Sequence, residues 1–283
     1  MQEMLRQLLK MNQSDENLER INPFIQLEQK YIALRKRYGD LFDELQSAVL
    51  KKDFYRQYAT GGQTIHRGFY SPSALDIITG GCDRGRVLKR FPKEGKYDYE
   101  YLQDINGRIL CCKRYETKSK EKRFLAEVEI LLYQDNCVIG LTFLPDADFL
   151  LISASECKYE NTKIVRYEHV LFNGICPAEG CTEINVEVFD YSDELLKTID
   201  WYRYTPSIKL LTECEISLYR DQDGNLQEYV VKEGNFLEQI KKPDFTSRRY
   251  SAKKRERVFH DMHRLPSTGT SSTGDGSVCP AGK

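Results

Sequence analysis

The sequence lacks the motifs that identify most enzymes. It has only four histidines, two of them at 260 and 263, and no Ser/His/Asp or Cys/His arrangement stands out. The glycine pairs at 61–62 and 80–81 lack the lysine and the strand-to-helix setting of a phosphate-binding loop. We therefore favour a protein that is not an enzyme, and an unrecognised hydrolase built on carboxylates remains an alternative.

Long apolar runs and a secretory signal are also missing. No stretch approaches the ~18 consecutive apolar residues that a membrane-spanning helix requires. The first residues carry only a short apolar patch and no small-residue cleavage site. Nine cysteines, an odd number, favour reduced thiols in a reducing compartment. We expect a cytoplasmic protein without a membrane partner.

Metal-ligand patterns are sparse. Cys176 and Cys181 could form half of a zinc site, and His169 is the nearest imidazole in sequence. Structural zinc usually takes four ligands from two close pairs, and adjacent Cys111 and Cys112 would point to opposite faces of a strand. We expect neither a metal nor another cofactor.

A long helix is predicted near the N-terminus. Apolar residues repeat at spacings of three and four from Phe24 to Ala48, and Asn22 and Pro23 have the residue types of a helix cap and a first helical position. Flanking apolar residues widen the stripe, which favours packing on a sheet over a coiled-coil dimer through 24–48. A shorter helix is expected from Ser71 to Gly81.

The apolar period changes to two beyond Val87, which predicts strands. Ten strands are expected, at 97–103, 108–116, 124–133, 137–144, 148–157, 163–172, 182–190, 195–204, 208–220 and 225–232. Short connections make neighbouring strands antiparallel, and turns such as Asp104-Ile105-Asn106-Gly107 suit tight hairpins. The predicted fold is mainly β with an N-terminal helix: a twisted antiparallel meander with one apolar face and one wet face.

Three regions follow from this pattern. They are an N-terminal helical segment packing on the sheet (1–62), an antiparallel β-meander domain (63–245), and a basic segment with a disordered tail (246–283). The basic segment supports a second hypothesis, a nucleic-acid-associated protein, whose phosphate-contacting residues would be Arg248, Arg249, Lys253, Lys254, Arg255 and Arg257.

The expected wet face of the sheet is acidic and carries aromatic residues. Such a surface suits a basic protein partner, because charge steers the encounter and rings anchor the contact. The partner-binding residues predicted there are Glu127, Glu129, Glu183, Glu187, Trp201, Tyr202, Tyr204, Glu213 and Glu215.

One segment resembles a known repeat. Tyr97-Asp98-Tyr99-Glu100-Tyr101, followed by the turn at 104–107, resembles the YD repeat of RHS-type toxin shells. The hairpin style, over about residues 70–232, is also similar to small bacterial β-meander proteins that look like immunity proteins of polymorphic toxins. The resemblance implies a β-meander fold and a toxin-neutralising role, and it transfers no site residue.

The leading hypothesis is therefore a non-enzymatic cytoplasmic protein-binding module. Its more specific form is an immunity protein that neutralises a basic toxin domain.

Overall fold

The computed structural model describes residues 15–61, 86–92, 96–118, 122–161, 163–173, 180–192, 195–222, 226–233 and 237–241. Its helices are α2 (Asp15–Tyr38) and α3 (Phe42–Leu50), with 3₁₀ turns η3 (Pro145–Ala147) and η4 (Pro206–Ile208). Its strands are β1 (Phe54–Thr60), β2 (Arg86–Val87), β3 (Tyr99–Asp104), β4 (Ile109–Lys118), β5 (Lys122–Gln134), β6 (Cys137–Leu144), β7 (Leu150–Glu160), β8 (Lys163–Phe172), β9 (Cys181–Ser192), β10 (Leu195–Thr205), β11 (Leu210–Arg220), β12 (Leu226–Glu233) and β13 (Leu237–Lys241).

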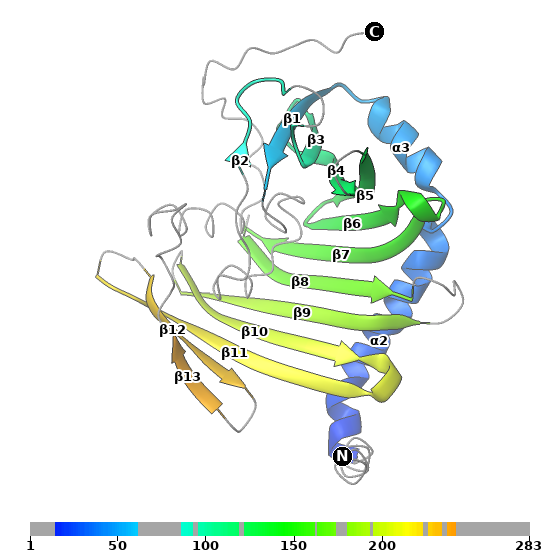
Figure 1. Ribbon diagram of the computed structural model, residues 1–283. Coiled ribbons are helices and arrows are strands. Elements are labelled where there is room, and N and C mark those ends of the chain that lie inside the picture. The colour runs from blue at the N-terminus through cyan, green and yellow to red at the C-terminus, as the bar shows by residue number, and fades with distance from the viewer. Residues whose placement is uncertain are drawn as a thin grey trace.

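All thirteen described strands belong to one antiparallel sheet (Figure 1). From β3 to β13 each strand pairs with the next one in sequence, as a meander requires. The other end has the order β3-β1-β2, so β1 lies between β3 and the two-residue strand β2. The predicted fold class is confirmed: a mainly antiparallel meander with helix at its N-terminal end.

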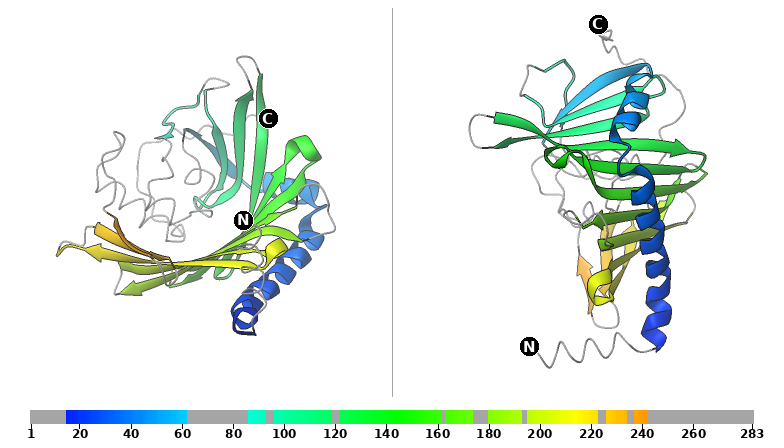
Figure 2. Two further views of the ribbon diagram at one scale, coloured as in Figure 1. Left: turned by 60° about the horizontal axis from the view of Figure 1, so that its bottom comes forward. Right: turned by 90° about the vertical axis from the view of Figure 1, so that its right-hand side faces the viewer.

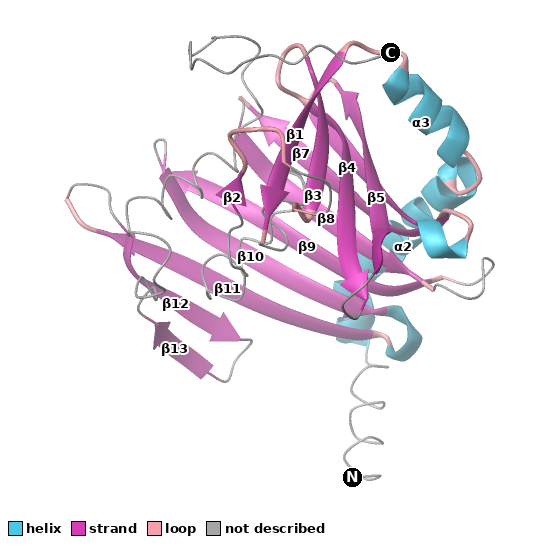
Figure 3. Cartoon of the chain, turned by 45° about the horizontal axis from the view of Figure 1, so that its top comes forward, coloured by secondary structure: helices cyan, strands magenta, loops and turns pink. Residues whose placement is uncertain are grey.

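The sheet is strongly bent, and both helices lie on its outer side (Figures 2 and 3). Helix α2 crosses the strands and packs over β7 and β9, while α3 continues toward β6, where Phe42 meets Phe143. We call the helix-bearing side the outer face and the opposite side the inner face. No helix in the described residues is long and apolar enough to cross a membrane.

Both faces of the sheet are apolar, contrary to the prediction of one wet face. An outer core gathers Phe24, Tyr31 and Phe42 of the helices with strand residues such as Ile184 and Val186. A separate inner core includes Ile199, Cys214, Ile216 and Leu218. The predicted alternation of Ile184, Val186 and Val188 with Glu183 and Glu187 in β9 agrees with the structure. Alternation within one strand, however, does not show which face its apolar side chains share with those of the next strand.

The predicted helix differs from the observed ones at both ends. Helix α2 begins at Asp15, so Pro23 lies inside it rather than at its first position. The chain leaves the helix after Tyr38, and a Cβ on Gly39 would lie 2.7 Å from the carbonyl oxygen of Arg35. Residues 54–60 form strand β1 rather than helix. The apolar stripe of α2 and α3 lines the outer core.

The Asp104–Gly107 hairpin is confirmed in detail. The Asp104 carboxylate accepts hydrogen bonds from the backbone N–H groups of Asn106 and Arg108, at 2.8 and 2.9 Å. Gly107 has a φ of 78°, which glycine adopts without strain. The helix expected at 71–81 lies outside the described residues.

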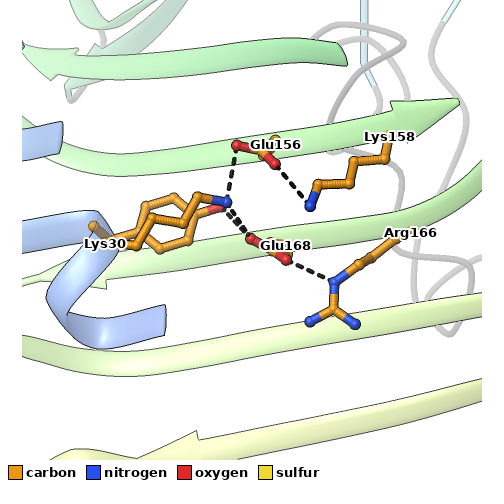
Figure 4. A network of polar contacts seen from close by, with 6 residues as sticks. Lys30, Glu156, Lys158, Arg166 and Glu168 are labelled. Atoms are coloured by element: carbon orange, nitrogen blue, oxygen red, sulfur yellow. Dashed lines mark hydrogen bonds and ion pairs between the residues drawn. The ribbon is translucent and has the colours of Figure 1, made fainter. Parts of the chain in front are cut away.

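A network of charges holds α2 against the sheet (Figure 4). Glu156 and Glu168 lie directly opposite each other on β7 and β8, and they are only 7% and 1% exposed. Lys30 of α2 bridges them, with Nζ 2.9 Å from Glu156 Oε2 and 2.7 Å from Glu168 Oε2. Like charges facing each other across strands repel, so the bridging cation is what makes this pair tolerable.

Further donors complete the network around Glu168. Tyr31 donates its hydroxyl to Glu168 Oε2 at 3.0 Å, and Arg166 donates Nε–H to Oε1 at 2.6 Å. Burial alone would raise the pKa of Glu168, but the hydrogen bonds and charges of Lys30 and Arg166 outweigh it and lower that pKa below its ordinary value. The docking of α2 therefore depends on an ionised Glu168.

Replacing Lys30 by Met should lower the free energy of unfolding at pH 7 by about 2 kcal/mol, because the variant leaves two buried carboxylates without the cation that bridges them. The loss is smaller than for a fully buried ion pair because Lys30 is partly exposed to solvent. Urea denaturation measures it, with the exposed Lys36→Met in the same helix as control. A lowered folded pKa means that Glu168 contributes stability above about pH 4.3 and loses it as pH falls. The difference between the two variants should therefore shrink in acid, and a difference independent of pH would contradict this account.

Candidate functional site

The nine residues predicted to bind a partner divide between the two faces of the sheet. The register pairs Trp201 with Glu187 and with Cys214 of the inner core, whereas Tyr202 pairs with Val186 and Glu213 on the outer face. The inner face holds Glu127, Glu129, Glu183, Glu187 and Trp201; the outer face holds Tyr202, Tyr204, Glu213 and Glu215. The expectation of a single acidic face was therefore wrong.

The inner carboxylates are neutralised or buried. Arg114 approaches Glu127 Oε1 to 3.0 Å through its Nη2, and Arg203 forms an ion pair with Glu183. Glu129 and Glu187 are both buried. Gly140 makes room for one of them, because a Cβ there would lie 3.0 Å from Glu129 Oε1 and 2.6 Å from Ser155 Oγ. The inner face is thus a packed surface with internal polar contacts.

The outer face is acidic beyond the edge of α2. Asp200 and Tyr202 alternate on β10, and Glu215 and Glu213 lie directly opposite them on β11. Neighbours across strands have Cβ atoms about 5 Å apart, and alternate residues along a strand lie about 7 Å apart. The four side chains therefore form the corners of a small rectangle of three carboxyl groups and one phenol. Asp190 of β9 lies near this rectangle on the same face.

We call this surface, made of Asp190, Asp200, Tyr202, Glu213 and Glu215, the outer acidic face. Asp190 and Glu215 are exposed, and the other three are partly exposed. Burial, and then the charges of Glu215 and Asp190, raise the pKa of Asp200 above its ordinary value. Asp200 is therefore both partly buried and close to other carboxylates.

Cations at the border only partly offset these charges. Arg20 of α2 donates to Glu213 Oε1 at 2.6 Å, and Lys232 of β12 lies opposite Glu215. Phe24 of α2 packs on Tyr202, with ring centroids 5.7 Å apart. Within the described residues, Asp190 and Asp200 have no ion-pair partner. The helix therefore supplies one rim of the outer acidic face and leaves the carboxylates of β9 and β10 available.

Sequence reasoning missed Asp190, Asp200 and Arg20. Asp200 was detectable in principle, because it alternates with Tyr202 and Tyr204 in the strand predicted at 195–204. Asp190 has the same spacing from Val186 and Val188 in the preceding strand. Arg20 carried no signal, since its partner is 193 residues away.

The structure describes some of the remaining predicted site residues and leaves others outside the described ranges. Tyr204 is buried against Phe24, so it serves the core rather than a surface. Cys181 is also buried, whereas Cys176 and the basic residues from Arg248 to Arg257 lie outside the described residues. In the part of the chain that the structure describes, no group of three or more His, Cys, Asp or Glu side chains is placed to hold a metal ion.

Comparison with known proteins places the chain near no characterised family. No protein-family model matches it, and no curated protein matches it. A solved structure of a protein of unknown function from Bacteroides fragilis aligns with 41% of this chain and 87% of its own, at 9% identity. The TM-score of 0.32 is too low to indicate a shared fold.

Replacing Glu215 by Gln should lower the pKa of Asp200 toward its ordinary value of 3.8, because one of the two repelling charges disappears. Carboxyl-carbon NMR titration measures this pKa directly. A raised folded pKa favours folding in acid and disfavours it above that pKa, so the same variant should be slightly more stable at pH 7. Glu183→Gln, on the inner face, should leave the titration of Asp200 unchanged. A titration unaffected by Glu215→Gln would mean that the charge of Glu215 does not contribute to the raised pKa of Asp200.

Proposed function

We propose that this protein is a protein-binding module that docks a basic surface of its partner on the outer acidic face. The observation that carries the proposal is the grouping of Asp190, Asp200, Glu213 and Glu215 on one accessible side of the sheet. Burial and then the charges of Glu215 and Asp190 raise the pKa of Asp200, and a basic partner would offset the part that is due to those charges.

A protein fits this surface better than a small ion does. The carboxylates are spread over three strands and are not gathered around a common point, and the described residues include no metal-binding group. A partner surface can contact all of them together and can also bury the partly exposed Tyr202. Charge would then give fast association, and the ring would give a central anchor.

The finer form of the proposal is an immunity protein that neutralises a basic toxin domain in the cytoplasm. It is supported by the YD-like hairpin at 97–107 and by the charge of the outer acidic face. A rigid sheet with one preformed acidic surface suits this role, because occluding a basic active surface requires no rearrangement of the binder.

Charge reversal tests the proposal. In the variant Asp200→Lys/Glu215→Lys, the affinity for the partner captured from the source cells should fall at least tenfold, because attraction becomes repulsion. The partner is first identified by pull-down with the intact chain, and the purified pair is then compared by calorimetry at low and moderate salt. A genuine partner should be basic, and its binding should weaken as salt increases.

The matched control is Asp53→Lys/Glu160→Lys, which changes the net charge equally at exposed positions outside this face. It should retain the affinity of the original protein. If both double variants bind equally well, docking on the outer acidic face is wrong.

A further inference from the structure

We propose that the surface around Phe91 and Tyr97 binds single-stranded nucleic acid, by stacking bases on its rings and pairing phosphates with its cations. The proposal goes beyond the proposed function and does not depend on the outer acidic face. The surface lies over β1–β5, at the other end of the sheet from β9–β11 (Figure 3). We call it the basic aromatic patch, and its members are Lys89, Arg90, Phe91, Lys96, Tyr97 and Arg123.

Four aromatic rings follow one another across this end of the sheet. Phe91 contacts Tyr58 of β1, with ring centroids 5.1 Å apart, and Tyr58 contacts Tyr97 at 4.6 Å. Tyr97 in turn contacts Tyr115 of β4 at 5.5 Å. Tyr58 is buried, Tyr97 is partly exposed, and Phe91 is 71% exposed. The row therefore combines a fixed base with ring surface that a nucleobase can reach.

The backbone holds Phe91 beside β1. The N–H of Leu88 donates to the carbonyl oxygen of Tyr58 at 2.8 Å, which continues the pairing of β2 with β1. Phe91 follows three residues later and packs edge-on against the Tyr58 ring. It is the most exposed aromatic residue in the described part of the chain. A ring supported on one side and open elsewhere contributes little to the core and is available to a partner.

Arg123 supplies a fixed cation at the other end of the row. Its guanidinium carbon lies 3.9 Å from the ring centroids of both Tyr97 and Tyr115, and its Nη2 donates to the carbonyl oxygen of Tyr97. The buried carboxylate of this cluster, Glu100, has other partners. Arg56 Nε lies 3.4 Å from its Oε1, and the Tyr115 hydroxyl donates to its Oε2 at 2.9 Å. The charge of Arg123 is thus held in position for an external anion.

More cations surround the exposed ring. The segment 84–96 contains six Lys or Arg and one Glu. Lys89, Arg90 and Lys96 are exposed, and no ion pair joins them to a carboxylate of the described residues. The exposed acid beside them, Asp98, accepts a backbone hydrogen bond at 2.6 Å. This excess of positive charge favours an anionic partner.

Single-stranded nucleic acid matches both properties of the patch, because it carries a charge at each phosphate and bases whose faces can stack on rings. A duplex would engage the cations, but its bases are already stacked on one another and would not reach the rings. A basic protein bound at the outer acidic face would be repelled here. The two ends of the sheet therefore suit partners of opposite charge.

Fluorescence anisotropy on the full chain tests the proposal, with a fluorescein-labelled oligothymidylate of about 12 nucleotides, an abasic strand of the same length and a duplex. Oligothymidylate should bind about tenfold more tightly than the abasic strand, since only it can stack. Phe91→Leu should weaken oligothymidylate binding about tenfold and leave the abasic strand unchanged. Phe91→Trp should retain the binding, because it restores a stacking surface.

The cations are tested separately. Lys89→Gln/Arg90→Gln should weaken both single strands and should reduce the slope of log affinity against log salt by about 1.4, which corresponds to two phosphate contacts. The matched control is Lys36→Gln/Lys197→Gln, which changes the net charge equally at exposed positions outside the patch. It should change neither the slope nor, by more than about twofold, the affinity.

Equal binding of oligothymidylate to the abasic strand or to the duplex would overturn base stacking and with it the proposal. Binding that every patch variant retains would overturn the patch as the site and would point to the basic segment 247–264. If no strand binds at low salt and Phe91→Leu instead weakens binding of the captured protein partner, the patch is a protein-docking surface and the nucleic-acid proposal is wrong. Absence of binding to any strand would also overturn it, and docking on the outer acidic face would stand unaffected.

Discussion

The bridge from Lys30 to Glu156 and Glu168 links helix α2 to strands β7 and β8 of the sheet. Two buried carboxylates on adjacent strands are unfavourable alone, and among the described residues the sheet supplies the flanking cations Lys158 and Arg166. Helix α2 completes the set and so acquires a fixed position on the outer face. That position determines which strand residues are covered and which stay open. The outer acidic face begins where α2 ends its coverage, at the contacts of Arg20 and Phe24.

The sheet carries an apolar core on each of its two faces. Carboxylates are therefore either paired beside these cores or exposed outside them. On the inner face, carboxylates such as Glu127 and Glu183 are tied to arginines. On the outer face, Asp190 and Asp200 keep no such partner among the described residues. The paired carboxylates of the inner face support the fold, whereas Asp190 and Asp200 are available for recognition. Both sets consist of acidic residues at similar positions in strands.

Much of the fold was predictable from the sequence, because period-two alternation is a local property. The ten expected strands correspond to β3–β12, and the Asp104 hairpin followed from turn chemistry. Strand β1 was missed because Phe54 and Tyr58 continue the helical apolar spacing, and only pairing with β3 makes 54–60 extended. The division of carboxylates between faces depends on the relative phase of β9 and β11, which no single strand encodes. The role of Arg20 was not predictable because its partner Glu213 lies 193 residues later in the sequence.

The meander has a further consequence for the order in which the protein can form. Each strand from β3 onward needs only its predecessor, so the sheet can grow by addition at one edge as the chain leaves the ribosome. Helix α2 is synthesised before every described strand, but its contact with Glu168 lies 138 residues later in the sequence and its contact with Glu213 lies 193 residues later. The apolar stripe of α2 therefore lacks its packing partners until most of the sheet has been synthesised. The first helix of the described chain is therefore among the last elements to be fixed in place.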